Sequence, residues 1–508
     1  MNRSSTGFRR IPSLFSMVSL LAVLLLTSCS RDAGSPRAAA ADVPSISIMA
    51  PLHFPNPPDS GIMDEIARLT GTRLDIEWVP DGIYTDKLNT ALSTNTVKQV
   101  NFVKRTDYMI AKSAIRSGAF WEIGPYLQDY PNLARLKKEI LEQGAVDGKI
   151  YGLYTERPSS RQGLIIRKDW LDRLGLQPPG TLDELYEVLR RFTWDDPDGN
   201  GRKDTVGLAD RNDLVYGAFK TLSSYFGTPN NWERRESTFV PEFETQAYID
   251  TMDFMRKLFR EELINTDFAI TSKEQQRDLL IRGVAGVYVG SMTDVQRLLE
   301  QAKAYNPKTE FTLVNRIMGP LGSRVWSIPN YNGLFLFSRK TIPTEDELKR
   351  ILAFFDRTME KDVSNIMKYG IENVHYTLSN GKVVLPEETY ALRVSEVSPL
   401  YTLMIADINN PNVLPIESHE PMADLADRLS NDNEKFTVPD PTVNLDSKTF
   451  DERGVELTKI VTDATYQYIL GFLDLAGFQD QVKRWENAGG RQVIQEYETS
   501  YRNQNEAG

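Results

Sequence analysis

The chain is 508 residues long, which exceeds the size that one hydrophobic core usually serves, so at least two lobes are expected. Hydrophobic residues make up 41% of the chain and aromatic residues 10%, values that are typical of globular proteins and exclude disorder over the whole length. The formal net charge of −11 argues against a nucleic-acid-binding surface. The single cysteine, Cys29, excludes an intramolecular disulfide.

Residues 1–28 have the pattern of a signal peptide. A start with three arginines and no acids precedes the apolar run 11–27, which is typical of a cleaved leader rather than of a spanning helix. Leu26-Thr27-Ser28 stands directly before Cys29 and resembles the bacterial lipobox, in which the cysteine is acylated and tethers the protein to the outer leaflet of the cell membrane. An ordinary secreted protein with an incidental cysteine is the alternative. Residues 29–43 are expected to be a flexible tether.

The folded part opens with alternating strands and helices. Residues 45–50 and 74–78 have the pattern of strands, whereas 59–69 and 84–92 have that of helices, which together are typical of an α/β lobe. The sequence then predicts helices at 107–117 and 125–142 and a strand at 149–153. The polar, irregular segment 154–161 follows, and we expect it to cross between the lobes.

The stretch 163–208 carries the densest set of signals. Leu164 to Ile166 is an apolar run of strand length, and a compact helix after it is expected to stop at Gly175. Thr181 is a candidate N-cap, and Glu184, three residues on, could bond back to the Thr181 amide as a capping box. The amphipathic helix that follows leads to an acidic loop and then to a short strand at 206–208.

The acidic loop matches the first half of a calcium-binding loop. Its expected oxygen ligands are the side chains of Asp196, Asp198, Asn200 and Asp204 and the carbonyl of Arg202. Gly201 at the sixth position permits the sharp bend, but the twelfth position holds Gly207 where an EF-hand has glutamate. We therefore predict a structural Ca²⁺ staple rather than an EF-hand. A solvated acidic turn is the alternative, because the same residues are common in turns.

The remainder of the chain is mostly helical, with two further strands. The patterns predict helices at 214–225, 246–263, 272–282, 291–304, 346–368, 450–475 and 482–501, and strands at 284–289 and 334–338. Nucleotide-binding loops and a G-x-S-x-G elbow are missing from the sequence. The three histidines, His53, His375 and His419, are far apart and lack the spacing of a zinc site.

Aromatic residues on loops and strand ends are candidates for ligand binding, because a sugar presents flat apolar C–H faces that an aromatic ring can cover. Trp232 ranks first, since Pro229, Asn230 and Asn231 place it on a turn. The other candidates are Tyr288 and Trp326, together with the polar residues Glu156, Arg157 and Arg161 of the crossing segment. For each tryptophan, packing in a core is the competing interpretation.

Several segments together resemble one family. They are the Cys29 lipobox, the DGKIYG segment at 147–152, the GLIIRKDWLDRLGL segment from Gly163 with the acidic loop after it, and the GIENVHY segment at 370–376. The chain is similar to the extracellular solute-binding lipoproteins of ABC importers, of the type that includes oligosaccharide- and alginate-binding proteins.

The resemblance implies an α/β fold of the type II periplasmic-binding-protein kind, with two lobes, a cleft between them and several crossovers. The expected first lobe comprises residues 44–155 and about 284–340. The expected second lobe comprises residues 156–283 and about 341–508.

The resemblance also implies a function without catalysis, in which a monomer captures a carbohydrate between its lobes and delivers it to an ABC permease in the membrane. The residues themselves support only a polar ligand compatible with aromatic rings. Two alternatives remain open at this point: a secreted enzyme acting on polysaccharides, and a signalling or scaffold lipoprotein that kept the fold.

Overall fold

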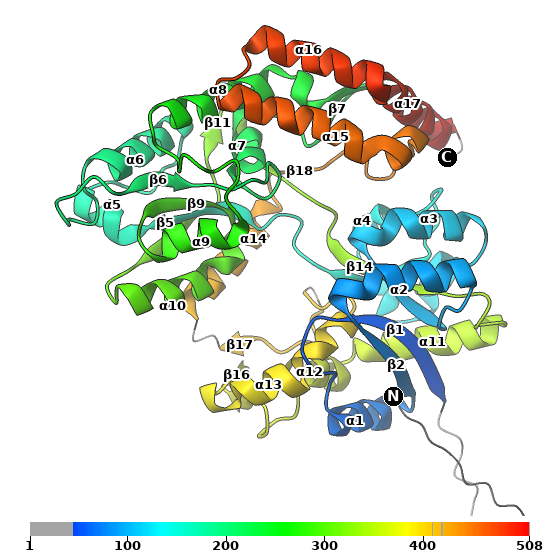
Figure 1. Ribbon diagram of the computed structural model, residues 1–508. Helices are drawn as coiled ribbons and strands as arrows, with labels where there is room; N and C mark the ends of the chain where they lie inside the picture. The colour runs from blue at the N-terminus through cyan, green and yellow to red at the C-terminus, as the bar shows by residue number, and fades with distance from the viewer. Residues whose placement is uncertain (1–43, 409, 418–419, 507–508) are drawn as a thin grey trace, which may run out of the picture. The chain divides into compact units, whose positions relative to one another are not determined.

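The computed structural model describes residues 44–408, 410–417 and 420–506, so the predicted signal peptide, Cys29 and the tether lie outside the described residues. Two sheets, each with its own hydrophobic core, organise this part of the chain (Figure 1). No helix within these ranges combines the length and the apolar character that crossing a membrane would need.

The first sheet has five strands in the order β2-β1-β3-β14-β4. Strand β1 pairs in parallel with β2 and β3, while β14 runs antiparallel to both β3 and β4. The buried faces of the strands supply residues such as Ile48, Val100 and Phe335 to the first core. The strands are β1 (Ser45–Leu52), β2 (Arg73–Pro80), β3 (Val100–Lys104), β4 (Gly152–Glu156) and β14 (Tyr331–Phe337).

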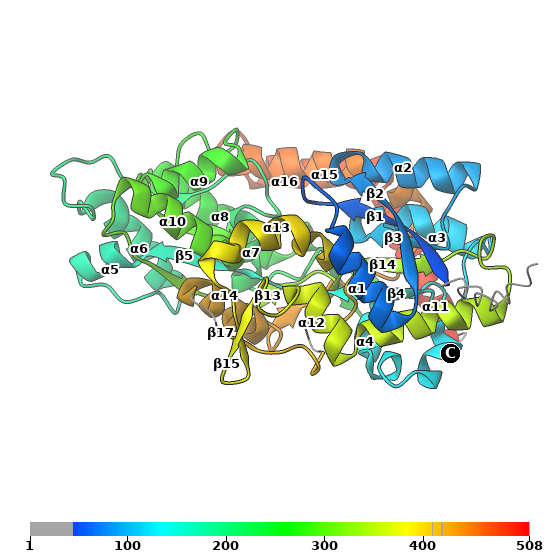
Figure 2. The ribbon, with the colours of Figure 1, turned by 90° about the horizontal axis from the view of Figure 1, so that it is seen from below.

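Helices cover both faces of this sheet. Figure 2 shows α2 and α3 on one side of the strands and α1 and α11 on the other. Helix α1 begins after Asp59, whose Oδ1 accepts a hydrogen bond from the Gly61 amide at 2.7 Å, and ends at Gly71, which has a left-handed φ of 66°. The helices are α1 (Ser60–Thr70), α2 (Asp81–Thr94), α3 (Tyr108–Arg116), α4 (Lys138–Gln143), α11 (Glu345–Thr358) and α12 (Lys361–Tyr369).

The second sheet has four strands in the order β10-β5-β9-β6. Strand β5 runs antiparallel to β9 and β10, and β6 pairs in parallel with β9. Three of these strands confirm the predicted runs at 164–166, 206–208 and 284–289. The strands are β5 (Gln162–Arg167), β6 (Val206–Ala209), β9 (Ala285–Ser291) and β10 (Phe311–Val314).

Most helices of the second sheet follow the predicted amphipathic pattern, but α14 was not predicted from the sequence. Helix α6 is capped as expected by Thr181, whose Oγ1 accepts from the Glu184 amide at 3.2 Å. The Glu184 carboxylate, however, accepts from the Gly180 amide at 2.7 Å rather than from that of Thr181, so the predicted capping box is shifted by one residue. The helices are α5 (Lys168–Leu174), α6 (Leu182–Trp194), α7 (Ala218–Phe226), α8 (Gln246–Arg260), α9 (Lys273–Ile281), α10 (Val295–Tyr305) and α14 (Pro421–Asn433).

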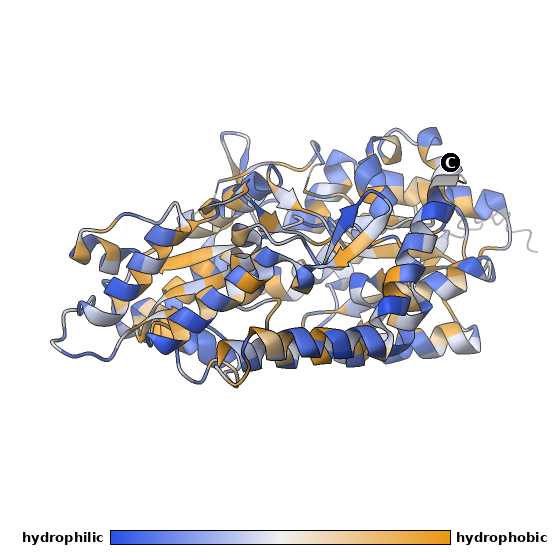
Figure 3. Cartoon of the chain, turned by 90° about the horizontal axis from the view of Figure 1, so that it is seen from above, coloured by the Kyte–Doolittle hydropathy of each residue, from blue (hydrophilic) through white to orange (hydrophobic). Residues whose placement is uncertain are grey.

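Three C-terminal helices form a further layer, which packs against α8 through α15 and α16. The Tyr248 hydroxyl on α8 and the Thr465 hydroxyl on α15 lie 2.9 Å apart. The same helices enclose a small aromatic core with the hairpin β7–β8. In Figure 3 the sheet strands are mostly orange, whereas the helices around them mix blue and orange faces. The elements are β7 (Trp232–Arg235), β8 (Thr238–Pro241), α15 (Lys448–Ile469), α16 (Leu475–Trp485) and α17 (Arg491–Glu506).

Short elements complete the fold. The two-residue strands β13 and β18 pair in parallel, and β15, β16 and β17 form a small sheet near α13. These elements are β11 (Met318–Gly319), β12 (Gly322–Ser323), β13 (Val325–Trp326), β15 (Thr377–Ser379), β16 (Lys382–Val384), α13 (Tyr390–Glu396), β17 (Ile416–Glu417) and β18 (Thr437–Val438).

Two segments that lie side by side connect the two sheets. Residues 157–161 lead from β4 to β5, and residues 327–330 lead from β13 to β14. The Arg157 amide donates to the Asn330 carbonyl at 2.9 Å, and the Ile328 amide donates to the Ser159 carbonyl at 2.9 Å. The Glu434 carboxylate, just after α14, accepts from the Ser159 amide and hydroxyl at 2.7 and 2.9 Å. The segment predicted to cross between lobes therefore does connect the two sheets.

The chain is divided between the sheets differently from the expected boundaries. Strand β9 stays in the second sheet, although the chain was expected to return to the first lobe at about residue 284. Helices α11 and α12, expected in the second lobe, supply Leu348, Phe355 and Val363 to the first core. Which lobe a segment joins is decided by strand pairing and helix packing between segments that are distant in the chain, and neither leaves a local signal in the sequence.

The helix predicted at 125–142 is wrong. Residues Gly124–Asp129 and Leu133–Arg135 form short 3₁₀ turns, and only α4 is an α-helix. Pro131 lies between the two turns, and a proline inside a helix removes a backbone donor and clashes with the preceding turn. The apolar spacing persisted across this break, which is why the pattern still looked helical.

Candidate functional site

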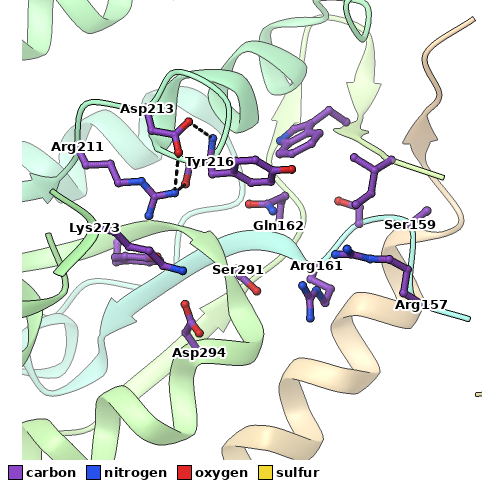
Figure 4. Close-up of a pocket in the computed structure, with 14 residues that line it drawn as sticks. Arg157, Ser159, Arg161, Gln162, Arg211, Asp213, Tyr216, Lys273, Ser291 and Asp294 are labelled. Carbon is purple, nitrogen blue, oxygen red and sulfur yellow. Dashed lines mark hydrogen bonds and ion pairs between the residues drawn. The ribbon is translucent and has the colours of Figure 1, made fainter. Parts of the chain in front are cut away.

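A pocket of about 370 Å³ lies where the first crossing segment enters β5 (Figure 4). The C-terminal ends of the parallel strands β6 and β9 point toward it, which is the edge where open α/β sheets usually bind ligands. Its lining residues are Arg157, Ser159, Ser160, Arg161, Gln162, Arg211, Asp213, Tyr216, Lys273, Tyr288, Ser291, Asp294, Trp326 and Ile328.

Positive charge exceeds negative charge in this pocket. Both acids are already engaged: Asp213 lies 3.2 Å from the Arg211 guanidinium, and Asp294 lies 2.7 Å from that of Arg277. By contrast, Arg157, Arg161 and Lys273 have no ion pair or side-chain hydrogen bond among the residues described here. These three side chains, called the free cations below, leave the pocket ready to accept an anion.

Two of the free cations, Arg157 and Arg161, are partly buried and act on each other, whereas Lys273 is exposed. Burial, and after it the repulsion of Arg161 and Arg105, lowers the pKa of Arg157 to about 10. Burial and then Arg277 also lower the pKa of Lys273. A half-buried cation without a partner is unfavourable, and an anionic ligand between these groups would relieve that cost.

Two aromatic rings form one wall of the pocket. Trp326 is buried, and its Nε1 donates to the Thr221 hydroxyl at 3.0 Å, so the ring is fixed. Tyr216 packs edge-on against it with centroids 5.7 Å apart and is 44% exposed. Tyr216 is therefore the ring in this pocket that a ligand can reach.

Tyr216 was not predicted as a site residue, because the pattern at 214–225 favoured a helix. Helix α7 begins only at Ala218, whose amide donates to Asp210 at 2.8 Å. Before it, Asp213 Oδ1 accepts from the amides of residues 215 and 216 and holds a turn. Gly217 completes this turn, because a Cβ at that position would lie 2.3 Å from the Asp213 carbonyl oxygen. An aspartate followed four residues later by a glycine, here Asp213 and Gly217, is the sequence signal that could have indicated a loop at this point.

Four of the six predicted ligand-binding residues line the pocket: Arg157, Arg161, Tyr288 and Trp326. Tyr288 is 1% exposed, so it contributes to the wall but little accessible surface. Glu156 does not line it; the side chain is buried in β4 and lies 3.1 Å from the Lys137 ammonium.

The expectation that Trp232 stacks on the ligand is not supported. Its ring is 7% exposed and belongs to the aromatic core between the β7–β8 hairpin and the C-terminal helices. Tyr497 meets it edge-on at 5.2 Å and Trp485 lies at 6.2 Å. The turn before Trp232 was correctly placed, but the covering helices come from more than 200 residues farther along the chain.

The acidic loop has the expected local shape. Gly199 and Gly201 adopt left-handed φ values of 71° and 76°. The Asn200 side-chain nitrogen lies 2.7 Å from Asp198 and 3.1 Å from Asp204, so these two carboxylates converge on one donor. Burial, with a smaller contribution from the neighbouring carboxylates, raises the pKa of Asp198.

The oxygen donors of this loop suit calcium in kind, and an ion at the point of convergence would take the place of the Asn200 amide group. Among the described residues, however, no three His, Cys, Asp or Glu side chains are arranged as a metal site. A metal ion in this loop would therefore need the Asn200 side chain and the Arg202 carbonyl as further ligands beside the carboxylates.

The chain matches known proteins over most of its length. Residues 56–332 match the family model described as bacterial extracellular solute-binding protein. The polygalacturonan/rhamnogalacturonan-binding protein YtcQ of Bacillus subtilis is 46% identical over 459 residues, which cover 90% of this chain and 91% of the relative. Lipoprotein LipO of the same species is 32% identical, covering 95% and 97% respectively.

A solved structure supports the fold. The substrate-binding protein FusA of Streptococcus pneumoniae, determined as an EF-hand mutant in complex with fructo-nystose, superposes with a TM-score of 0.64. The alignment covers 91% of this chain and 99% of that one, at 18% identity. At this level of identity the likeness shows the two-lobed fold alone, and it confirms the predicted fold class.

Proposed function

We propose that this chain, which belongs to the bacterial extracellular solute-binding protein family, captures an acidic oligosaccharide for import by an ABC permease. The observation that carries the proposal is the set of free cations, Arg157, Arg161 and Lys273, beside the accessible ring of Tyr216. Guanidinium groups suit planar carboxylates, and an aromatic ring suits the apolar face of a sugar. A sugar acid carries both features in one residue.

The similarity to YtcQ supports this ligand class. That relative binds polygalacturonan and rhamnogalacturonan, polymers that contain galacturonic acid, whose carboxylate is ionised at neutral pH. A neutral oligosaccharide would leave the two partly buried arginines, Arg157 and Arg161, without a counter-charge. The pocket therefore favours the acidic form of a sugar over its neutral counterpart.

Titration calorimetry of the wild-type protein tests this function. We expect tetragalacturonate to bind, its methyl ester to bind about tenfold or more weakly, and a neutral oligosaccharide to bind weakest, because the ester keeps the rings but removes the charge. Chromatography of the same sample checks for cleavage. Equal binding of the acid and the ester would contradict an acidic ligand. Shortened products would favour the enzyme alternative, and failure of every sugar to bind would favour the scaffold alternative.

The two crossing segments suggest how capture leads to delivery. Solute-binding folds close around a ligand by hinge motion at a few connecting residues, and residues 157–161 and 327–330 hold that place here. Two of the free cations, Arg157 and Arg161, belong to this hinge, so a bound anion could stabilise one arrangement of the lobes. We propose that the protein acts as a monomer and presents this ligand-bound form to the permease.

Membrane attachment is proposed at Cys29, which lies outside the described residues. The lipobox-like sequence before it and the similarity to a lipoprotein, LipO, support this assignment. A Cys29→Ser variant should appear in the soluble fraction or keep its signal peptide, because no acyl chain can be attached. Fractionation of cells, followed by mass measurement of the protein, checks this. A processed variant that stays in the membrane would contradict anchoring through Cys29.

Calcium is proposed to staple the acidic loop. The converging carboxylates of Asp198 and Asp204 support this, as does the fold neighbour FusA, which was solved as an EF-hand mutant. Chelation should lower the melting temperature, and added Ca²⁺ should restore it, because binding to the folded form stabilises it by mass action. An Asp198→Asn, Asp204→Asn variant should lose this response. A melting curve that chelator leaves unchanged, with no metal in the purified protein, would contradict the staple.

A further inference from the structure

An accessible tyrosine of the first lobe lies near the start of the first crossing segment. Tyr401 belongs to the 3₁₀ turn Ser398–Leu403 and is 47% exposed, although its neighbours Leu400 and Leu403 are buried in the first core. The turn is therefore rigidly anchored while this one ring faces outward. A single exposed aromatic on an anchored turn can offer a flat surface to a ligand at little cost in lost side-chain freedom.

The main chain ties this turn to the crossing segment. The Ala406 amide donates to the Tyr154 carbonyl of β4 at 3.2 Å, and β4 leads directly into Arg157. Just before the neighbouring strand β14, the Asn330 carbonyl accepts from the Arg157 amide, and within β14 the Asn332 side-chain nitrogen lies 3.5 Å from the Tyr401 hydroxyl. One backbone bond and one side-chain contact thus place Tyr401 beside the start of the crossing.

Electrostatics agree with this placement. Burial raises the pKa of Tyr401, and Arg157 and Arg161 are the first charges that act against the rise. From the other direction, Tyr216 and Tyr401 both act to raise the pKa of Arg157, which burial lowers. Arg157 is therefore within electrostatic range of one tyrosine from each lobe.

The surroundings of Tyr401 are polar and suited to hydroxyl groups. The imidazole of His53 lies 6.2 Å from the Tyr401 ring, centroid to centroid, and Asn332 offers an amide on the same side. Asp81 lies 3.6 Å from the His53 Nδ1 and 3.1 Å from the Lys104 ammonium, so the nearby charges are engaged with one another. This surface offers a ring face and polar side chains, whereas the pocket offers the free cations.

We propose that Tyr401, with His53 and Asn332 beside it, forms a first-lobe subsite that stacks on a sugar ring of the same ligand whose carboxylate binds Arg157 and Arg161. This deepens the proposed function and rests on it. The ligand is then an oligosaccharide of at least two residues, one held by its charge and one by its ring face.

Calorimetry with tetragalacturonate tests the subsite. Tyr401→Ala is expected to weaken binding about 10- to 100-fold, the range that loss of one large buried apolar contact produces. Tyr401→Phe keeps the ring and loses only the hydroxyl, so it should bind within about threefold of the wild type. Tyr390→Ala removes a 63% exposed tyrosine from α13 of the same lobe and serves as the matched control, with unchanged affinity expected.

The outcomes separate the subsite from the function on which it rests. If the wild type binds tetragalacturonate and Tyr401→Ala binds equally well, the subsite is overturned and the proposed function stands. Loss of affinity in Tyr401→Phe as large as that in Tyr401→Ala would show a role for the hydroxyl and overturn the stacking role. If the wild type binds no oligosaccharide, both proposals fall. Thermal unfolding of each variant confirms that the comparison is made between folded proteins.

Discussion

Replacing Arg157 and Arg161 together by glutamine should weaken tetragalacturonate binding by about 100-fold or more, because each charge-assisted hydrogen bond contributes about 1.5–3 kcal/mol and each 1.4 kcal/mol is a factor of ten. Each single variant should lose about tenfold or more. Both guanidinium groups line the pocket, and neither has another partner among the described residues to compete for it.

The stability of the double variant should not fall. Burial holds the pKa of Arg157 at about 10, so the unliganded protein gains nothing from this charge, and its removal relieves repulsion from Arg161 and Arg105. The melting temperature without ligand is therefore expected to be equal to or higher than that of the wild type. A role of these residues in the fold alone would predict the opposite change.

Calorimetry with the acid and with its methyl ester measures the charge effect directly. The double variant should lose most of the preference for the acid, and its affinity for the ester should change little. The control for net charge is Lys138→Gln on α4, because the Lys138 side chain is 86% exposed. Wild-type affinity for tetragalacturonate in the double variant would exclude these arginines from the site.

Trp232→Ala should destabilise the protein by about 3–5 kcal/mol, the usual cost of truncating a buried tryptophan to alanine. The ring is enclosed by Trp485 and Tyr497, so its loss would leave a cavity between the β7–β8 hairpin and the C-terminal helices. The hairpin and these helices meet in this core, which is why the effect should reach beyond one contact.

Equilibrium unfolding in denaturant gives this difference from the shift of the midpoint. Trp194→Ala is the matched control, because that ring is 39% exposed at the end of α6 and its removal should cost well under about 1 kcal/mol. The folded fraction of Trp232→Ala should still bind tetragalacturonate. Unchanged stability together with lost affinity would instead return this ring to the binding site.

Local signals predicted the elements well wherever a few neighbouring residues decide the conformation. Thr181 caps α6 because its hydroxyl reaches an amide only three residues away, and Gly175 ends α5 with a left-handed φ of 66°. The apolar run from Leu164 becomes a strand buried along its whole length. The irregular, arginine-bearing segment after β4 was recognised as a crossing for the same reason, and two of its predicted residues line the pocket.

Only the tertiary structure decided which distant segments meet. Trp232 lies on a turn, as its neighbours indicated, but α16 and α17 return to cover it. Strand β9 pairs with β5 rather than returning to the first sheet, and Tyr401 comes within electrostatic range of Arg157 although the two residues are far apart in the chain. Capping and turns depend on bonds between near neighbours, so the sequence determines them by itself. Whether a residue is buried or lines a pocket depends on which surfaces pack together in the folded chain, and residues along the whole chain determine that packing jointly.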